Sequence, residues 1–142
     1  MKKLLLVVLA LASLLVAACG DREAYRTHRA ERSKPKVAVG ENSLIIRRAP
    51  YPNIMVLPDG SMKIDEIGIP IKQPQQRMLQ ESFVKLQILR QNTLAAPDAD
   101  PTRHSLPITV PPGVEPFPDD LVQQIPEFKD YTEALDNYRA ER

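Results

Sequence analysis

The chain has 142 residues with a formal net charge of +1, one cysteine, no tryptophan and 14 prolines. After loss of a leader, this length allows one small domain rather than two. The balanced charge and the few aromatic residues argue against nucleic-acid binding, which uses basic surfaces with interleaved stacking side chains. A single cysteine excludes an internal disulfide, so packing must hold the fold together. Basic residues gather between positions 21 and 36, and acidic residues beyond position 91.

The first 18 residues have the pattern of a secretory signal peptide. Two lysines precede an apolar run over residues 4–16, and Ala17 and Ala18 stand directly before Cys19. The apolar run is shorter than the ~20 residues that a membrane-spanning helix needs. Residues 1–18 are therefore predicted to be a cleaved leader rather than a transmembrane anchor.

Residues 15–20 read Leu-Val-Ala-Ala-Cys-Gly and resemble the lipobox of bacterial lipoproteins, with Val16 where leucine is usual. The resemblance implies cleavage by signal peptidase II between Ala18 and Cys19 and a diacylglycerol on the cysteine thiol. Two acyl chains make such an anchor effectively permanent. In that family, an aspartate directly after the cysteine favours the inner membrane, whereas Gly20 stands here. We therefore expect an outer-membrane lipoprotein facing the periplasm, with an ordinary secretory signal as the alternative.

Residues 19–36 carry charged and polar side chains on every side and predict a tether between lipid and domain. The alternative is a direct contact of its basic residues with anionic lipid headgroups. Acidic residues interrupt the basic ones, which favours a solvated tether. Pro35 marks its expected end.

Residues 37–94 predict a small α+β domain. Short apolar runs at 43–48 and 53–57, a Pro-Asp-Gly-Ser turn at 58–61 and alternation over 62–71 indicate an antiparallel hairpin or three-strand meander. Pro74 suits the first turn of a helix that continues to about residue 92. One face of this helix is expected to cover the sheet, and its apolar residues are Met78, Leu79, Phe83, Leu86 and Leu89.

The remaining residues are predicted to form a proline-rich extended segment over 95–126 and an amphipathic helix over 127–142. Val84 and Ile88 lie on the opposite side of the first helix, so they need a cover. Two readings stay open: the apolar stripes of the two helices cover each other, or they bind a protein partner. The candidate partner surface is Val84, Ile88, Phe128, Tyr131, Leu135 and Tyr138.

The pattern from Ile54 to Leu89, with its Pro-Asp-Gly turn and the pairs Ile64-Asp65 and Gln76-Arg77, resembles a strand-turn-strand-helix pattern of small proteobacterial envelope proteins. The resemblance covers about a quarter of the chain. It implies an envelope location and no particular activity.

Residues capable of catalysis or metal binding are scattered. His28 lies in the tether and His104 in the proline-rich segment, so neither stands on an element rigid enough for a general base. The acidic pairs at positions 98 and 100 and at 119 and 120 lack the glycine and spaced ligands of a calcium loop. We expect no enzyme, metal, cofactor or small-molecule ligand.

The expected function is therefore that of a non-enzymatic accessory or scaffolding lipoprotein, which binds another envelope protein through its helix face or proline-rich tail. An inhibitor or immunity-type lipoprotein, whose acidic distal surface blocks a basic enzyme, is the alternative. An enzyme is the third possibility.

Overall fold

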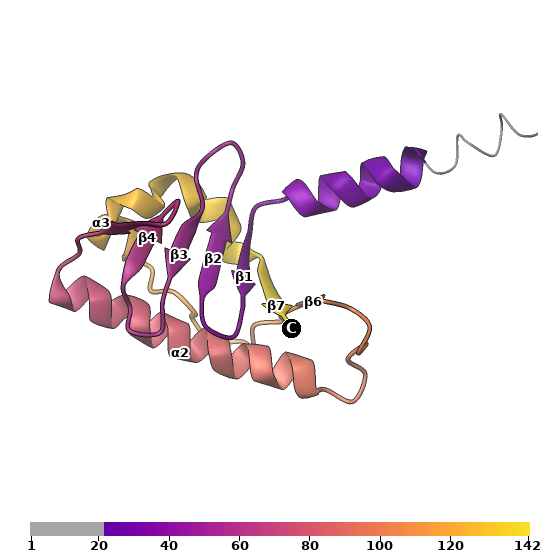
Figure 1. Cartoon of the computed structure of the whole chain (residues 1–142). Coiled ribbons are helices and arrows are strands. Elements are labelled where there is room, and N and C mark those ends of the chain that lie inside the picture. Colours follow the sequence, from indigo (N-terminus) through magenta and orange to yellow (C-terminus); the bar gives the residue numbers. More distant parts are fainter. Residues whose placement is uncertain (1–21) are drawn as a thin grey trace, which may run out of the picture. The chain divides into compact units, whose positions relative to one another are not determined.

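The computed structural model describes residues 22–142, so Cys19 and the leader lie outside the described residues (Figure 1). The chain divides into two compact units, residues 1–34 and 35–142. The described part of the first unit is a helix over residues 22–33 whose side chains are all exposed. Within residues 22–34, the segment expected to be a tether thus has no buried side chain, whereas Lys36 at its expected end already belongs to the sheet.

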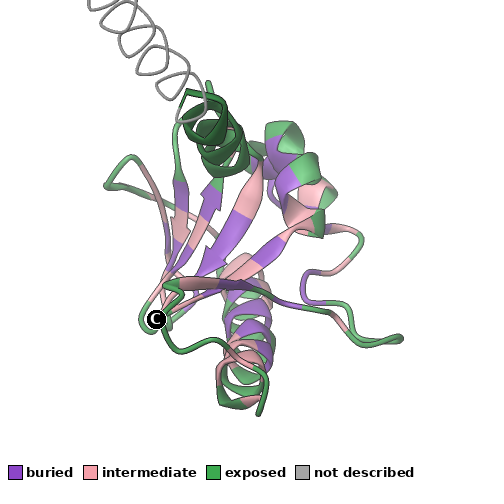
Figure 2. Ribbon diagram, turned by 90° about the vertical axis from the view of Figure 1, so that its right-hand side faces the viewer, coloured by how far each residue is buried: buried purple, intermediate pink, exposed green. Residues whose placement is uncertain are grey.

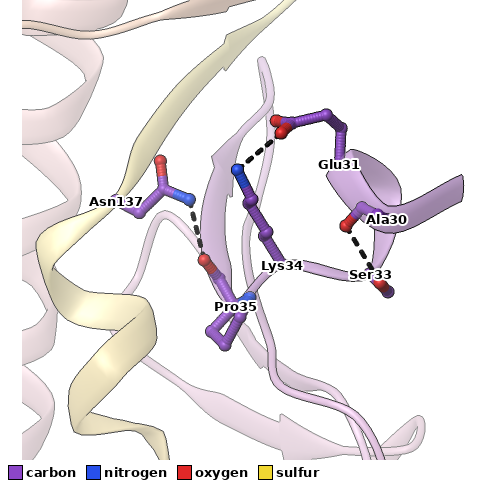
Figure 3. Close-up of polar contacts among 6 residues, drawn as sticks. All are labelled: Ala30, Glu31, Ser33, Lys34, Pro35 and Asn137. Atoms are coloured by element: carbon purple, nitrogen blue, oxygen red, sulfur yellow. Dashed lines mark hydrogen bonds and ion pairs between the residues drawn. The ribbon is translucent and has the colours of Figure 1, made fainter. Parts of the chain in front are cut away.

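Polar contacts at the end of the first unit and at the start of the second are drawn in Figure 3. In the first, Lys34 Nζ lies 2.5 Å from Glu31 Oε1, and Ser33 Oγ donates to the Ala30 carbonyl. In the second, Asn137 Nδ2 donates to the Pro35 carbonyl at 2.8 Å. Both partners of the ion pair are largely exposed, so it adds little stability.

The second unit is built around a seven-stranded sheet with the order β5-β4-β3-β2-β1-β7-β6. Neighbouring strands are antiparallel except β1 and β7, which run parallel. The strands are β1 Lys36–Val39, β2 Leu44–Arg47, β3 Ile54–Val56, β4 Met62–Ile64, β5 Ile67–Ile69, β6 Ser105–Pro107 and β7 Tyr138–Glu141. The expected α+β class is confirmed, but the sheet is larger than a hairpin or meander.

Two tight turns close the meander from β3 to β5. Gly60 has a φ of +80°, and a Cβ there would lie 2.0 Å from the Gln76 carbonyl oxygen, so the turn presses against the next helix. In the following turn, Asp65 and Glu66 have positive φ values of 45° and 70°. Two successive positive φ values are typical of the two-residue hairpin turn that matches strand twist.

Helix α2, Gln73–Ala95, begins at a proline-containing first turn as expected and lies across the strands (Figure 1). The apolar side expected to cover the sheet is confirmed by the burial of Leu79, Phe83, Leu86 and Leu89. Gln87 Nε2 donates to the Gly40 carbonyl at 2.6 Å. Such bonds fix the helix against the ends of the strands.

The C-terminal residues form no single α-helix, so the helix expected over 127–142 is wrong. A short helix α3, Leu121–Gln124, is followed by the 3₁₀-helix η1, Pro126–Asp136, and then by β7. The buried residues of η1 are Phe128, Tyr131 and Ala134. Their spacing of three matches the 3₁₀ repeat better than the α-helical one.

The helices α2, α3 and η1 all contribute to one core on one face of the sheet, which we call the inner face. The strand residues of this core alternate along each strand, for example Val37 and Val39 of β1. Figure 2 shows the buried residues gathered between the sheet and the helices. The opposite face of the sheet contributes nothing to this core.

Candidate interaction surface

The aromatic part of the expected partner surface belongs to the core. Phe128 is fully buried, and Tyr131 and Tyr138 are nearly so, while Leu135 is half-buried against the same cluster. Their prediction as a partner surface is wrong because η1 packs on the inner face of the sheet, and because Tyr138 of strand β7 points to that same face. The C-terminal segment does return to the domain, but it covers the sheet rather than the second stripe of α2.

These aromatic side chains are held by specific contacts. The ring of Phe117 lies 6.2 Å from that of Phe128 and 6.4 Å from that of Tyr138. The Tyr131 hydroxyl donates to the Pro52 carbonyl at 2.5 Å. Burial, with a smaller contribution from Asp136, raises the pKa of Tyr138 to about 12. All of this is expected of structural residues.

Val84 and Ile88 keep about half of their surface exposed, at 52% and 54%. They form a narrow apolar strip on the outer side of α2, flanked by the exposed residues Glu81 and Lys85. Lys85 Nζ donates to the Glu115 carbonyl at 3.1 Å, so one rim of the strip is occupied by the loop before α3. Two side chains give this strip little apolar area.

A larger surface lies on the second face of the sheet, which we call the open face. By strand alternation it carries Lys36, Ala38, Ile45, Arg47, Met55, Lys63, Gly68, Ser105, Pro107, Arg139 and Glu141. The register places one residue from each strand in a continuous row: Gly68, Lys63, Met55, Ile45, Ala38, Arg139 and Pro107. The centre of this row is apolar, and its two flanks are cationic.

The open face has an apolar floor with a polar rim. Ile45 and Met55 are half-buried and stand outside the core cluster. They line a hollow whose rim includes Arg47, Asp65 and Glu66. The Asn53 backbone N–H donates to Asp65 Oδ1 at 3.1 Å, which fixes that carboxylate at the rim. On the other side of the row, Arg139 donates to Ser105 Oγ and to its carbonyl oxygen, each at 3.1 Å.

Sequence reasoning missed this surface, although the sequence carries a signal for it. The segments Leu44-Ile45-Ile46 and Ile54-Met55-Val56 are unbroken apolar runs without alternation. Such runs are typical of strands that bury side chains on both faces. In β2, Leu44 and Ile46 are buried on the inner face, and the apolar residue between them, Ile45, lies on the open face.

A separate, acidic surface covers α3 and η1. Between positions 119 and 136 one lysine, Lys129, stands among six carboxylates: Asp119, Asp120, Glu127, Asp130, Glu133 and Asp136. Glu133 Oε2 accepts from Arg48 Nε at 3.1 Å, and this bond raises the pKa of the guanidinium. The Arg48 guanidinium also lies 5.0 Å from the ring centre of Tyr51.

The residues considered for chemistry lie apart. His104 is exposed in the loop before β6, and His28 is exposed in the first unit. Hydrogen bonds from Thr102 hold the pKa of Asp100 below its ordinary value, so this carboxylate closes its own turn. Within residues 22–142, no three His, Cys, Asp or Glu side chains are grouped so as to hold a metal ion.

Within the same described range, no helix has both the length and the apolar character needed to cross a bilayer. Comparisons with family models, with curated proteins and with solved structures gave no match. The open face, which presents a residue from every strand of the sheet, is the candidate interaction surface.

Proposed function

We propose that this protein is a bacterial envelope lipoprotein, anchored through lipid on Cys19, that binds another envelope protein without catalysing a reaction. The open face is the binding surface in this proposal. The observation that carries it is the apolar centre formed by Ile45 and Met55 on a sheet face that takes no part in the core.

This arrangement has the composition of a protein interface. Protein-binding surfaces combine an apolar centre with a polar rim, and they exclude water best where the centre is rigid. Ile45 and Met55 are paired directly across β2 and β3, so backbone ladders on both sides hold them in place. Arg47 and Lys63 on the same face favour a partner with carboxylates around an apolar patch.

The anchoring part of the proposal is supported by the lipobox-like residues 15–20 and by the polar helix over 22–33, which offers no apolar side to a membrane. Replacing Cys19 with serine is expected to move the protein from the membrane to the soluble fraction and to abolish palmitate labelling. A Cys19→Ser variant that stays in the membrane pellet and still incorporates label would contradict the anchoring.

The binding part is tested by placing a photo-cross-linking amino acid at single positions of the anchored chain in cells. Met55 represents the open face, Val84 the outer strip of α2, and the exposed Asn92 serves as the control. We expect one defined envelope-protein adduct from position 55 and none from position 92. An adduct from position 84 alone would move the binding site to α2, and no adduct from either would contradict protein binding.

The acidic surface of α3 and η1 supports one alternative, an inhibitor or immunity-type lipoprotein that blocks a basic enzyme. The same experiment separates the two functions when Asp130, exposed on η1, is the labelled position. An adduct with a basic hydrolase from position 130 would favour the inhibitor. Its absence beside an adduct from position 55 would favour the accessory function.

A further inference from the structure

The two edges of the sheet differ in how their backbone groups are closed. At the β6 edge, the backbone bonds from Ile108 N to the Tyr138 carbonyl and from Arg142 N to the His104 carbonyl fix the alternation. The backbone groups of Ser105 and Pro107 therefore point away from β7, toward the free edge of the sheet. Pro107 has no N–H, and the Ser105 carbonyl already accepts from Arg139. This edge offers little to a further strand.

The β5 edge is open at Gly68. The bonds from Leu57 N to the Ser61 carbonyl and from Asp65 N to the Asn53 carbonyl fix the alternation of β4, in which the backbone groups of Lys63 point toward β3. By alternation, the backbone groups of Met62 and Ile64 point toward β5, where these residues pair with Ile69 and Ile67. The N–H and C=O of Gly68 consequently point away from β4, in the plane of the sheet, and are available to a further strand.

The side chains around this position leave room for another strand. A Cβ added to Gly68 would have no atom within 4 Å, and its φ lies outside the left-handed region. Ile67 is 70% exposed although its pairing with Ile64 places its side chain on the inner face, because within residues 35–142 no further strand or helix covers this edge. Strand β5 itself carries no charged residue, whereas charges commonly protect edge strands from pairing.

We propose that β5 pairs with β5 of a second copy of this chain, antiparallel and around a two-fold axis at Gly68. This register places Ile67 beside Ile69 of the partner subunit, which would cover its exposed side chain. It also brings the acidic turn at Asp65 and Glu66 toward the segment that leads to Lys72 of the partner subunit. A parallel pairing would instead bring two acidic turns together, so charge favours the antiparallel one.

The pairing involves three residues of each strand, and Pro70 cannot donate beyond them. The contact therefore lies well below the ~1,200 Å² of a stable interface, and the pair is weak in dilute solution. Two copies anchored in one membrane have a far higher effective concentration. The pairing geometry is independent of the proposed function, and only this gain in concentration rests on the proposed anchoring.

The test is thiol cross-linking of a Gly68→Cys variant of the full chain in its membrane, with palmitate labelling of the same samples. In the proposed register the two Cα atoms at position 68 form a hydrogen-bonded pair about 5.5 Å apart, which a disulfide spans. The matched controls are Lys63→Cys, one strand inward, and Pro107→Cys, at the other edge. Across the same dimer, positions 63 lie roughly 14 Å apart, three strand spacings.

On mild oxidation we expect about tenfold more dimer from Gly68→Cys than from either control, because only that pair meets disulfide geometry. Peptide mass spectrometry must find the link between the two positions 68. Adding Ile67→Lys to the Gly68→Cys variant should reduce the dimer severalfold, since a charge then enters the apolar contact.

Equal dimer yields from the three cysteine variants would overturn the pairing, and so would a product that joins position 68 to a different protein. A labelled chain without the position-68 dimer leaves the anchoring intact and removes the pairing. A dimer without label does the reverse. A product through Cys19 in the wild-type chain would show that this thiol is free.

Discussion

The substitution Gly60→Ala tests how closely the turn between β3 and β4 packs on α2. Gly60 is buried with a φ of +80°, and an added Cβ would lie 2.0 Å from the Gln76 carbonyl oxygen. Gly113 provides a matched control because its φ is +82° and a Cβ there would have no atom within 4 Å. The two positions share the backbone conformation and differ in the space around it.

The left-handed conformation alone costs an alanine about 1–2 kcal/mol, so Gly113→Ala should lose this amount. At Gly60 the neighbour is helix backbone, which cannot rotate away, and the turn must move by more than an ångström. That movement breaks the bond from Gln76 Nε2 to the Asp59 carbonyl and opens the packing beneath the turn. Gly60→Ala should therefore lose about 3–5 kcal/mol in total.

Urea unfolding followed by circular dichroism measures both losses. With a slope of about 1–3 kcal/mol per molar urea, Gly60→Ala should lower the midpoint by roughly 2 M and Gly113→Ala by less than half as much. Gly68→Ala, with an ordinary φ and open space, should leave the midpoint nearly unchanged. Similar midpoints for the variants at positions 60 and 113 would refute the close contact between turn and helix.

Three further predictions concern the core and the surface. Leu86→Ala should lower the free energy of unfolding by about 2–4 kcal/mol because Leu86 is fully buried. Val84→Ala on the same helix should change it by about 0.5 kcal/mol or less, because Val84 is half-exposed. Equal denaturation midpoints for the two variants would show that the helix face is misassigned. The pKa of Tyr138 is raised to about 12 in the folded state, so the neutral phenol stabilises the fold. This stabilisation is fully present below the unfolded pKa of about 10 and is lost as the pH rises from 10 to 12. Between pH 9 and pH 12, the free energy of unfolding should fall by about 1–2 kcal/mol more in the native chain than in Tyr138→Phe. An identical fall in both chains would exclude this linkage. Glu133→Gln should cost about 0.5 kcal/mol or less, since the carboxylate that pairs with Arg48 is 67% exposed, and a larger shift of the thermal midpoint would contradict a weak surface pair.

Local chemistry was sufficient to predict the middle of the domain from the sequence. The glycine turn at Gly60, the alternation around Ile64 and the proline at position 74 each act within a few residues, so they predict the meander and the start of α2 directly. The apolar spacing of α2 likewise separates the buried Leu86 from the exposed Val84. These are properties of neighbouring residues, and neighbours are fixed by the sequence.

The candidate surface required the tertiary structure. Ile45 and Met55 form an apolar centre only because β2 and β3 pair in one register and the helices α2, α3 and η1 pack on the other face of the sheet. The unbroken apolar runs indicate two-sided strands, but they do not say which side is left without a helix. That choice depends on contacts between residues far apart in the chain.

The sequence by itself determined the class of the domain, its central meander and the polar character of the segment before it, because propensity, turn chemistry and periodicity are local. Only the tertiary structure decided the place of the C-terminal residues. Tyr138 and Ala140 alternate inward in β7, which lies between β1 and the edge strand β6 and runs parallel to β1. A four-residue strand has too little local preference to be separated from a helix end, and its conformation is stabilised by pairing with strands on both sides.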